Sequence, residues 1–274
     1  MWSEHNPRSF HKKAIFMTSN RHNGKIIAIH QPNFFPWLGY FHKIYHSDVF
    51  VFHDNAEYSK KAYINRTFVR KAPNSPERAY ITLPLKKHSD FERIKNLKVD
   101  NSQNFHQKLL NRIRNVYQKT PFFGEYFPLV EETILNSGNL ESLLKINMGT
   151  IECILKILSI KREFVFSSSL PVNGKKSEYN LNVVKHLKGA AYFSGSGARE
   201  YQNDADFDRE GIRLVYQDIY DFLEGHPYEQ FQEKKFLNGL SIIDALFNVG
   251  AKGIMEIFKS YEKAMSEKQG RVEK

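Results

Sequence analysis

The sequence has little cysteine and no long apolar run. Cys153 is the only cysteine among 274 residues, which excludes an internal disulfide framework and any metal site built from several cysteines. No stretch reaches the roughly 18–20 consecutive apolar residues of a membrane-spanning helix. The first 20 residues also lack the apolar core of a secretory signal peptide. These absences favour a soluble cytoplasmic protein with a reduced thiol.

Aromatic residues and positive charge are abundant instead. The chain contains 22 Phe and 14 Tyr, enough apolar surface to build a sizeable core. Its net charge is +10, and the excess is uneven, because residues 60–119 hold 15 Lys and Arg against 4 Asp and Glu. A field of this kind attracts polyanions or phosphorylated small molecules. A solvated basic face without a ligand is the alternative.

Alternating strand and helix signals predict an α/β fold with a mostly parallel sheet and flanking helices. Apolar runs at 26–30 and 48–52 enclose a helix signal that begins near Pro36, which is the order of a parallel βαβ unit. Apolar residues at helical spacing place a helical layer at about 104–158. Further strands are expected at 80–85, 94–99, 163–166, 191–193 and 212–216, and further helices at 178–187 and from 240 onward.

The chain is expected to have three parts. Residues 1–24 are polar and show no periodic apolar pattern, so we expect a flexible extension there. Residues 25–250 form a single α/β domain. Residues 251–274 continue as a charged C-terminal helix.

The densest group of polar residues follows the first predicted strand. Ligands of open α/β sheets bind at the carboxyl ends of the strands, where His30 lies. His30 can transfer a proton, and Gln31 and Asn33 offer amide donors and acceptors. Trp37 or Tyr40 could stack on a base or a sugar. A structural turn with an aromatic plug is the alternative interpretation.

A second group follows the second predicted strand. Asp54 could perform acid–base chemistry beside His30 if the two strands are parallel neighbours. Lys60 and Asn65 come next, and Arg66 is suited to a bidentate phosphate contact. A polar turn followed by solvated charges is the alternative. We expect His30, Asn33, Asp54 and Arg66 to converge in one pocket.

Two later motifs complete the candidate site. Ser194 and Gly195 open a small-residue loop after a strand, where backbone amides can approach a phosphate. Asp244 lies in an apolar helix, so we expect an inward-facing acid with a basic or amide partner such as Arg66 or Asn65. His42 and His46 are four residues apart without an evident third ligand, so no metal site is expected.

The segment from Ile29 to Tyr40, IHQPNFFPWLGY, resembles the opening signature of the WbqC-like family. The resemblance extends over about residues 25–250. Asn55 and Glu57 depart from it where a second acid and a Gln are expected, and Tyr179 departs where an Arg is expected. Further matching blocks are Asp48–Asp54, Asn65-Arg66, Ser168–Leu170 with Glu178, Tyr192–Gly195, His226-Pro227, Gln230-Phe231 and Leu240–Gly250.

The family is associated with bacterial O-antigen and other surface-polysaccharide clusters. The resemblance therefore implies a cytoplasmic transferase that adds an acyl or aminoacyl group to a nucleotide-linked amino sugar. His30 and Asp54 would activate the acceptor, Arg66 and nearby lysines would hold the diphosphate, and Asp244 with Asn248 would support the site from behind. The sequence specifies no cofactor, sugar or donor.

Two other functions stay open. The order of strand, His-containing loop and helix is similar to that of nucleotidylyltransferases, although their His-x-Gly-His motif is absent. The basic stretch and its aromatic residues are also compatible with a non-catalytic RNA-binding protein, for example one that binds the tRNA of an aminoacyl donor.

Overall fold

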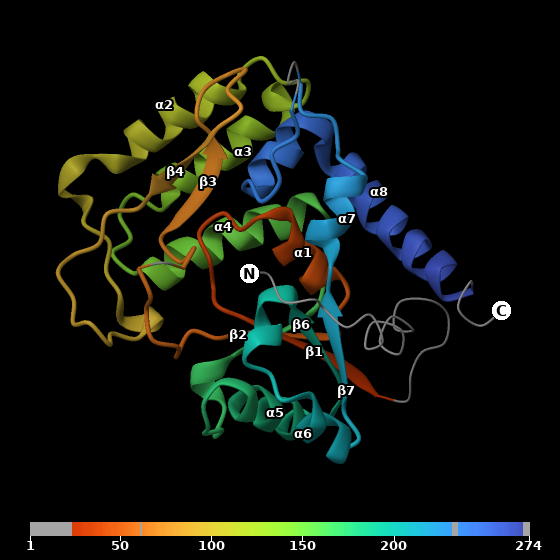
Figure 1. The fold of residues 1–274 in the computed structure, drawn as a ribbon. Coiled ribbons are helices and arrows are strands. Elements are labelled where there is room, and N and C mark those ends of the chain that lie inside the picture. The colour runs from red at the N-terminus through yellow and green to blue at the C-terminus, as the bar shows by residue number, and fades with distance from the viewer. Residues whose placement is uncertain (1–23, 61, 232–234, 271–274) are drawn as a thin grey trace, which may run out of the picture.

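The computed structural model describes residues 24–60, 62–231 and 235–270, so nearly all of the expected extension at 1–24 lies outside it. At its centre is a five-stranded sheet of order β5-β2-β1-β6-β7, in which every neighbouring pair is parallel. The predicted α/β fold with a mostly parallel sheet is therefore confirmed (Figure 1). The strands are β1 (Lys25–His30), β2 (Val49–Phe52), β5 (Glu163–Phe166), β6 (Gly189–Gly195) and β7 (Arg213–Gln217).

The strand order creates a switch point between β1 and β6. From β1 the chain continues to β2 and β5 on one side, whereas β6 and β7 are added on the other side. Ile27 of β1 is accordingly in register with Val49 of β2 and with Tyr192 of β6. At such a point a crevice opens outside the carboxyl ends of the strands.

Helices cover both faces of the sheet (Figure 1). Alternate strand residues point to opposite faces, so that Ala28 and Phe193 enter one apolar core and Ile27 and Tyr192 enter another. The larger core contains residues of α1 (Leu38–Tyr45), α4 (Leu143–Ile157), α7 (Ile219–Gly225) and α8 (Ile242–Gly270). The smaller core lies under α5 (Lys176–His186) and α6 (Asp204–Arg209).

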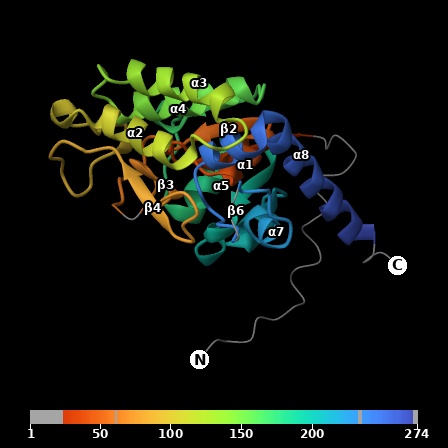
Figure 2. The same ribbon diagram turned by 90° about the horizontal axis from the view of Figure 1, so that it is seen from above.

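The predicted helical layer at 104–158 is present. It consists of α2 (Phe105–Tyr117), α3 (Phe123–Asn136) and α4, and Figure 2 shows these helices stacked along one side of the molecule. Short 3-10 turns surround the layer and the sheet, at η2 (Ile94–Asn96), η3 (Asn101–Gln103), η4 (Ser167–Ser169) and η5 (Ser196–Glu200).

The basic stretch contains an antiparallel hairpin outside the parallel sheet. Its strands are β3 (Arg66–Arg70), which was not predicted, and β4 (Arg78–Thr82), which ends before Pro84. The strand expected at 94–99 is wrong. Ile94 and Leu97 are both buried at a spacing of three residues, which suits the 3-10 turn η2 rather than a strand.

The last helix has a break at Gly250, whose φ of +68° and ψ of 177° are not helical. A Cβ at Gly250 would lie 2.9 Å from the ring of Phe122, so this conformation and this contact both favour glycine. The charged helix expected from residue 251 is the second half of α8, which extends to Gly270. Within the described ranges, no helix combines the length and apolar character needed to span a membrane.

Candidate functional site

A cavity of about 330 Å³ lies at the switch point, and we call it the switch-point cavity. The end of β1 contributes His30 and Gln31 to its wall, and the end of β6 contributes Ser194 and Gly195. Parallel strands end at the same edge of a sheet, so these four predicted residues meet although their positions in the chain are far apart. The remaining wall residues are Ile29, Lys43, His53, Asn180, Tyr192, Gly197, Ala198 and Tyr201.

Lys43 is the only lysine in this wall, and it is buried. It comes from α1, is 3% exposed, and its burial lowers its pKa to about 7. No carboxylate in the described parts of the chain forms an ion pair with it. A Cβ at Gly195 would lie 3.2 Å from Lys43 Nζ. Because a buried ammonium without a counter-charge is costly, the cavity favours an anionic ligand.

His30 is held as a neutral imidazole. Its Nδ1 donates to the backbone oxygen of Gln31 at 3.1 Å, so Nε2 retains its lone pair. Burial and, to a smaller extent, the charge of Lys43 lower the pKa of His30 to about 3. The ring of Tyr40 contacts the ring of His30 edge-on at 4.9 Å, and its hydroxyl donates to the same Gln31 oxygen. Tyr40 is buried, so it positions His30 and presents no free face to a ligand.

His53 is a second neutral imidazole in the wall. Its ring is stacked on Tyr179, with 4.6 Å between centroids, and its Nδ1 is 3.0 Å from Ser167 Oγ. Ser167 Oγ donates in turn to Asp54 Oδ1, also at 3.0 Å. The Ser167 oxygen therefore accepts from His53 Nδ1 and leaves His53 Nε2 as an acceptor. Burial lowers the pKa of His53 to about 4.

Asp54 is behind this wall rather than in it. Besides the bond from Ser167, its carboxylate accepts hydrogen bonds from Ser168 N at 2.9 Å and from Ser168 Oγ at 2.6 Å. The side chain is buried and holds the turn η4 against the end of β2. Asp54 thus reaches the switch-point cavity only through Ser167 and His53.

Five other predicted residues do not line the switch-point cavity. Trp37 covers Gly39 and contacts Tyr220, and Lys60 is exposed. Arg66 begins the hairpin, and its guanidinium lies 4.2 Å from the centre of the Tyr80 ring. Asn33 is buried, and Asn65 is buried with hydrogen bonds from Tyr58 Oη and to Leu83 O. Of the four residues expected to converge, only His30 lies in this wall. Arg66 is absent from it because the hairpin is a separate sheet.

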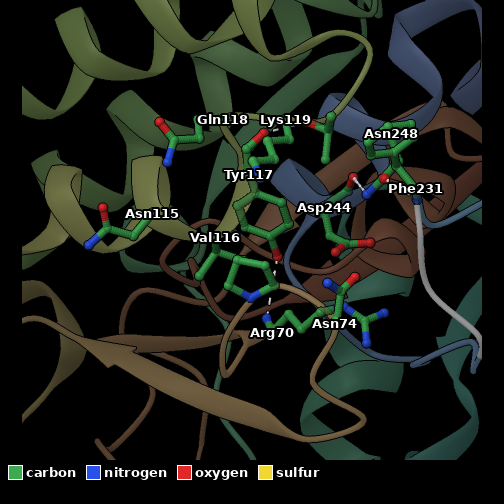
Figure 3. A pocket seen from close by; sticks show the side chains of 12 residues that line it. Arg70, Asn74, Asn115, Val116, Tyr117, Gln118, Lys119, Phe231, Asp244 and Asn248 are labelled. Carbon is green, nitrogen blue, oxygen red and sulfur yellow. Dashed lines mark hydrogen bonds between the residues drawn. The ribbon is translucent and has the colours of Figure 1, made fainter.

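Asp244 lies at a second cavity of about 200 Å³, between the hairpin, α2 and α8 (Figure 3). Its Oδ1 accepts from Tyr228 Oη at 2.7 Å and from Gln230 Nε2 at 3.0 Å. The expected inward-facing acid with an amide partner is confirmed, but the partner is Gln230 and not Asn65. Burial raises the pKa of Asp244.

Asn248 lies one helical turn after Asp244 and lines the same second cavity. Its Nδ2 donates to the backbone oxygen of Asp244 at 2.8 Å, and its Oδ1 accepts from Phe231 N at 2.7 Å. Both residues therefore organise the second cavity. Neither touches the wall of the switch-point cavity.

The sequence profile of the WbqC-like protein family matches residues 31–256, which is most of the chain. The chain belongs to the WbqC-like protein family. A relative is the uncharacterized protein Rv1507c of Mycobacterium tuberculosis, 26% identical over 234 residues, which are 83% of this chain and 95% of that protein. No solved structure matches the chain.

The wall residues of this WbqC-like protein that were not singled out from sequence as site residues include Lys43, Asn180 and Tyr201. For Lys43 a signal exists, since it is the only lysine in the apolar helix LGYFHKIY that follows β1. Asn180 and Tyr201 carry no such signal. Among the residues that the structure describes, no three His, Cys, Asp or Glu side chains form a metal-binding group.

Proposed function

We propose that this WbqC-like protein is a cytoplasmic transferase that acts on a nucleotide-linked amino sugar during synthesis of O-antigen or another bacterial surface polysaccharide. The group transferred is an acyl or aminoacyl group, and the acceptor is the amine of the sugar. The observation that carries the proposal is the burial of Lys43 in the wall of a cavity at the switch point of the sheet, without an ion pair to any carboxylate of the described residues.

The diphosphate of the nucleotide supplies the missing counter-charge. It binds beside Lys43 Nζ and approaches the backbone of the loop that begins at Gly195. Gly197 has no atom within 4 Å of where a Cβ would be, which leaves room for a ligand at the backbone. Charge-assisted contacts of this kind are the strong hydrogen bonds of phosphate sites.

His30 receives the proton of the acceptor. The amine nitrogen attacks the carbonyl carbon of an ester or thioester, the C–N bond forms, and the alcohol or thiol leaves with the electrons of the C–O or C–S bond. The proton of the amine passes to His30 Nε2 and from there to the leaving group. A bound diphosphate raises the pKa of His30 from its value in the empty cavity, because a nearby anion favours the imidazolium.

Thermal unfolding with dTDP-, UDP- and GDP-sugars tests the binding part of the proposal. We expect at least one of them to stabilise the wild type and to lose this effect in Lys43→Met. Lys60→Met, which removes an exposed lysine, is the matched control and should behave as wild type. If no nucleotide sugar stabilises the folded protein, or if Lys43→Met is stabilised equally, the proposal is wrong.

Mass spectrometry tests the transfer part. The stabilising nucleotide amino sugar is incubated with wild-type protein and with an acyl thioester or an aminoacyl-tRNA as donor. We expect the mass of the sugar nucleotide to increase by that of the acyl group minus one hydrogen. If the mass is unchanged with both classes of donor, the protein binds the nucleotide sugar without catalysing transfer, and the transferase proposal is wrong.

A further inference from the structure

The hairpin β3–β4 presents aromatic rings and guanidinium groups on one continuous surface. Phe68 and Tyr80 are stacked with 3.9 Å between ring centroids. Arg66 lies 4.2 Å from the centre of the Tyr80 ring, and Arg78 lies 4.4 Å from that of Phe68. We call this surface the aromatic–arginine strip, and its residues are Tyr63, Arg66, Phe68, Arg78, Tyr80 and Tyr220.

The register of the hairpin explains why these side chains gather. Phe68 is directly opposite Tyr80, and residues two positions apart share a face of a strand, so Arg66 and Arg78 flank this pair diagonally. Thr67 and Ile81 point to the other face and are buried. The strip is therefore the outer face of a ribbon whose inner face packs on the protein.

Tyr80 and Phe68 are stacked between the guanidinium groups of Arg66 and Arg78, so both faces of these two rings are covered. The tyrosines of the strip are nevertheless partly exposed. Tyr63, Tyr80 and Tyr220 are 43%, 40% and 39% exposed, respectively. Tyr63 extends the strip beyond the hairpin, with its ring 5.8 Å from that of Phe68. Tyr220 extends it at the other end through Gly239, because a Cβ there would contact both Tyr220 and Arg78.

The positive charge of the strip has no carboxylate partner in the described part of the chain. Neither Arg66 nor Arg78 forms an ion pair with a carboxylate in the ranges described by the structure. Both belong to the segment 60–119, which holds 15 basic and 4 acidic residues. A partner of the strip must therefore bring negative charge as well as flat faces that stack on rings.

We propose that the aromatic–arginine strip binds single-stranded RNA. Bases stack on Tyr63 and Tyr220, whose rings have only tilted or edge-on ring neighbours among the described residues, and phosphates bind at Arg66 and Arg78. Aromatic platforms beside positive charge are the usual means of holding a single strand, because every base has a π face and every linkage carries a charge. The strip is distinct from the proposed transferase site, since none of its residues lines the switch-point cavity.

Fluorescence anisotropy with a labelled 12-nucleotide oligo(U) RNA tests the proposal. We expect wild-type binding at 50 mM KCl that weakens about tenfold or more at 200 mM KCl, because phosphate contacts release counterions. Tyr63→Ala and Tyr220→Ala should each weaken binding by roughly 5- to 100-fold, the range found for loss of one stacked base. Arg66→Gln should reduce the dependence on salt.

Matched controls separate the strip from general effects. Phe91→Ala removes an aromatic ring that is 76% exposed outside the strip, and Lys71→Gln removes an exposed lysine paired with Glu77. Both should bind as wild type does. Tyr63 precedes β3 and Tyr220 lies in α7, so Tyr63→Ala remains informative if Tyr220→Ala is misfolded by circular dichroism.

Three results would overturn the proposal. They are absence of binding at 50 mM KCl, binding that does not change with salt, and controls that weaken binding as much as the strip variants do. An oligo(dT) probe of the same length identifies the source of recognition. If oligo(dT) and oligo(U) bind with equal affinity, the strip recognises only bases and phosphates. If oligo(U) binds more tightly, the strip also recognises the 2′-hydroxyl group. Either result supports the proposal.

Discussion

The ammonium of Lys43 lies against the backbone of Gly195, where a Cβ would be only 3.2 Å from Nζ. Lys43 is on α1, directly after β1, and Gly195 ends β6 on the other side of the switch point. The absence of a side chain at residue 195 leaves the ammonium a path into the cavity. The charge of the cavity is thus set by one contact between the first helix and a strand from the second half of the chain.

Binding of a nucleotide sugar should take up a proton. At pH 8 most Lys43 side chains are neutral, because burial lowers the pKa of Lys43 to about 7. A bound diphosphate favours the ammonium, so about one proton enters the complex. Calorimetry in Tris and in HEPES should show binding enthalpies that differ with the ionisation enthalpy of the buffer. Equal enthalpies in the two buffers would contradict the role of Lys43.

Lys43 should make the stability of the empty protein depend on pH. Its pKa in the fold, about 7, is below its ordinary value of 10.5, so the unfolded chain binds more protons between these values. The free energy of unfolding should therefore gain about 2 kcal/mol from this group between pH 7 and pH 9. Urea unfolding should show the gain in wild type and in Lys60→Met but not in Lys43→Met.

His30→Gln should slow transfer without loss of binding. A positioned general base contributes about 10²- to 10⁴-fold to the rate, and the variant lacks it. Stabilisation by the nucleotide sugar should persist, since Lys43 is unchanged. His186→Gln, at an exposed position, serves as the control. If His30→Gln turns over at the wild-type rate, His30 is not the group that accepts the proton of the amine.

Asp54→Asn should destabilise the fold. The carboxylate accepts hydrogen bonds from Ser167 and from two groups of Ser168, and an amide cannot accept all three with comparable strength. We expect the free energy of unfolding to fall by about 2–4 kcal/mol. Asp90→Asn, at an exposed position, should change it by less than about 0.5 kcal/mol. Urea denaturation of the two variants compares them directly.

Asp244→Asn should leave the switch-point cavity intact. Because burial raises the pKa of Asp244 above its ordinary 3.8, its contribution to stability is greatest at low pH and is lost as pH rises through the folded pKa. The variant should therefore gain stability relative to wild type as pH rises above about 4, the ordinary pKa of the carboxyl group. Nucleotide sugars should stabilise the variant as much as they stabilise wild type. If they do not, the second cavity affects binding at the switch-point cavity, which would contradict this prediction.

The parallel sheet could be predicted because its strands are short buried apolar runs between turn signals. The strand ends were then enough to bring His30, Gln31, Ser194 and Gly195 to one wall, since parallel strands end on the same edge. The hairpin could not be placed in this way. Arg66 follows β2 in the sequence, but it begins a separate sheet whose position depends on packing against α2 and on the segment before α8.

Lys43 was missed for a different physical reason. A lysine in a helix is nearly always solvated, so its position alone does not indicate burial. Its burial follows from the approach of β6 to α1, which is a long-range contact. The strand expected at 94–99 failed similarly, because Ile94 and Leu97 pack at a spacing that only the tertiary structure selects.

The position of β1 between β2 and β6 has a consequence for synthesis of the protein on the ribosome. β2 follows β1 closely in the chain, but β6 begins only at Gly189. At about 5–20 residues per second, one edge of β1 remains without its neighbour for roughly 10–30 s of translation. During that time the unpaired edge can pair with other chains, and a ribosome that stalls before Gly189 holds a chain without β6 and β7, in which this edge of β1 stays open.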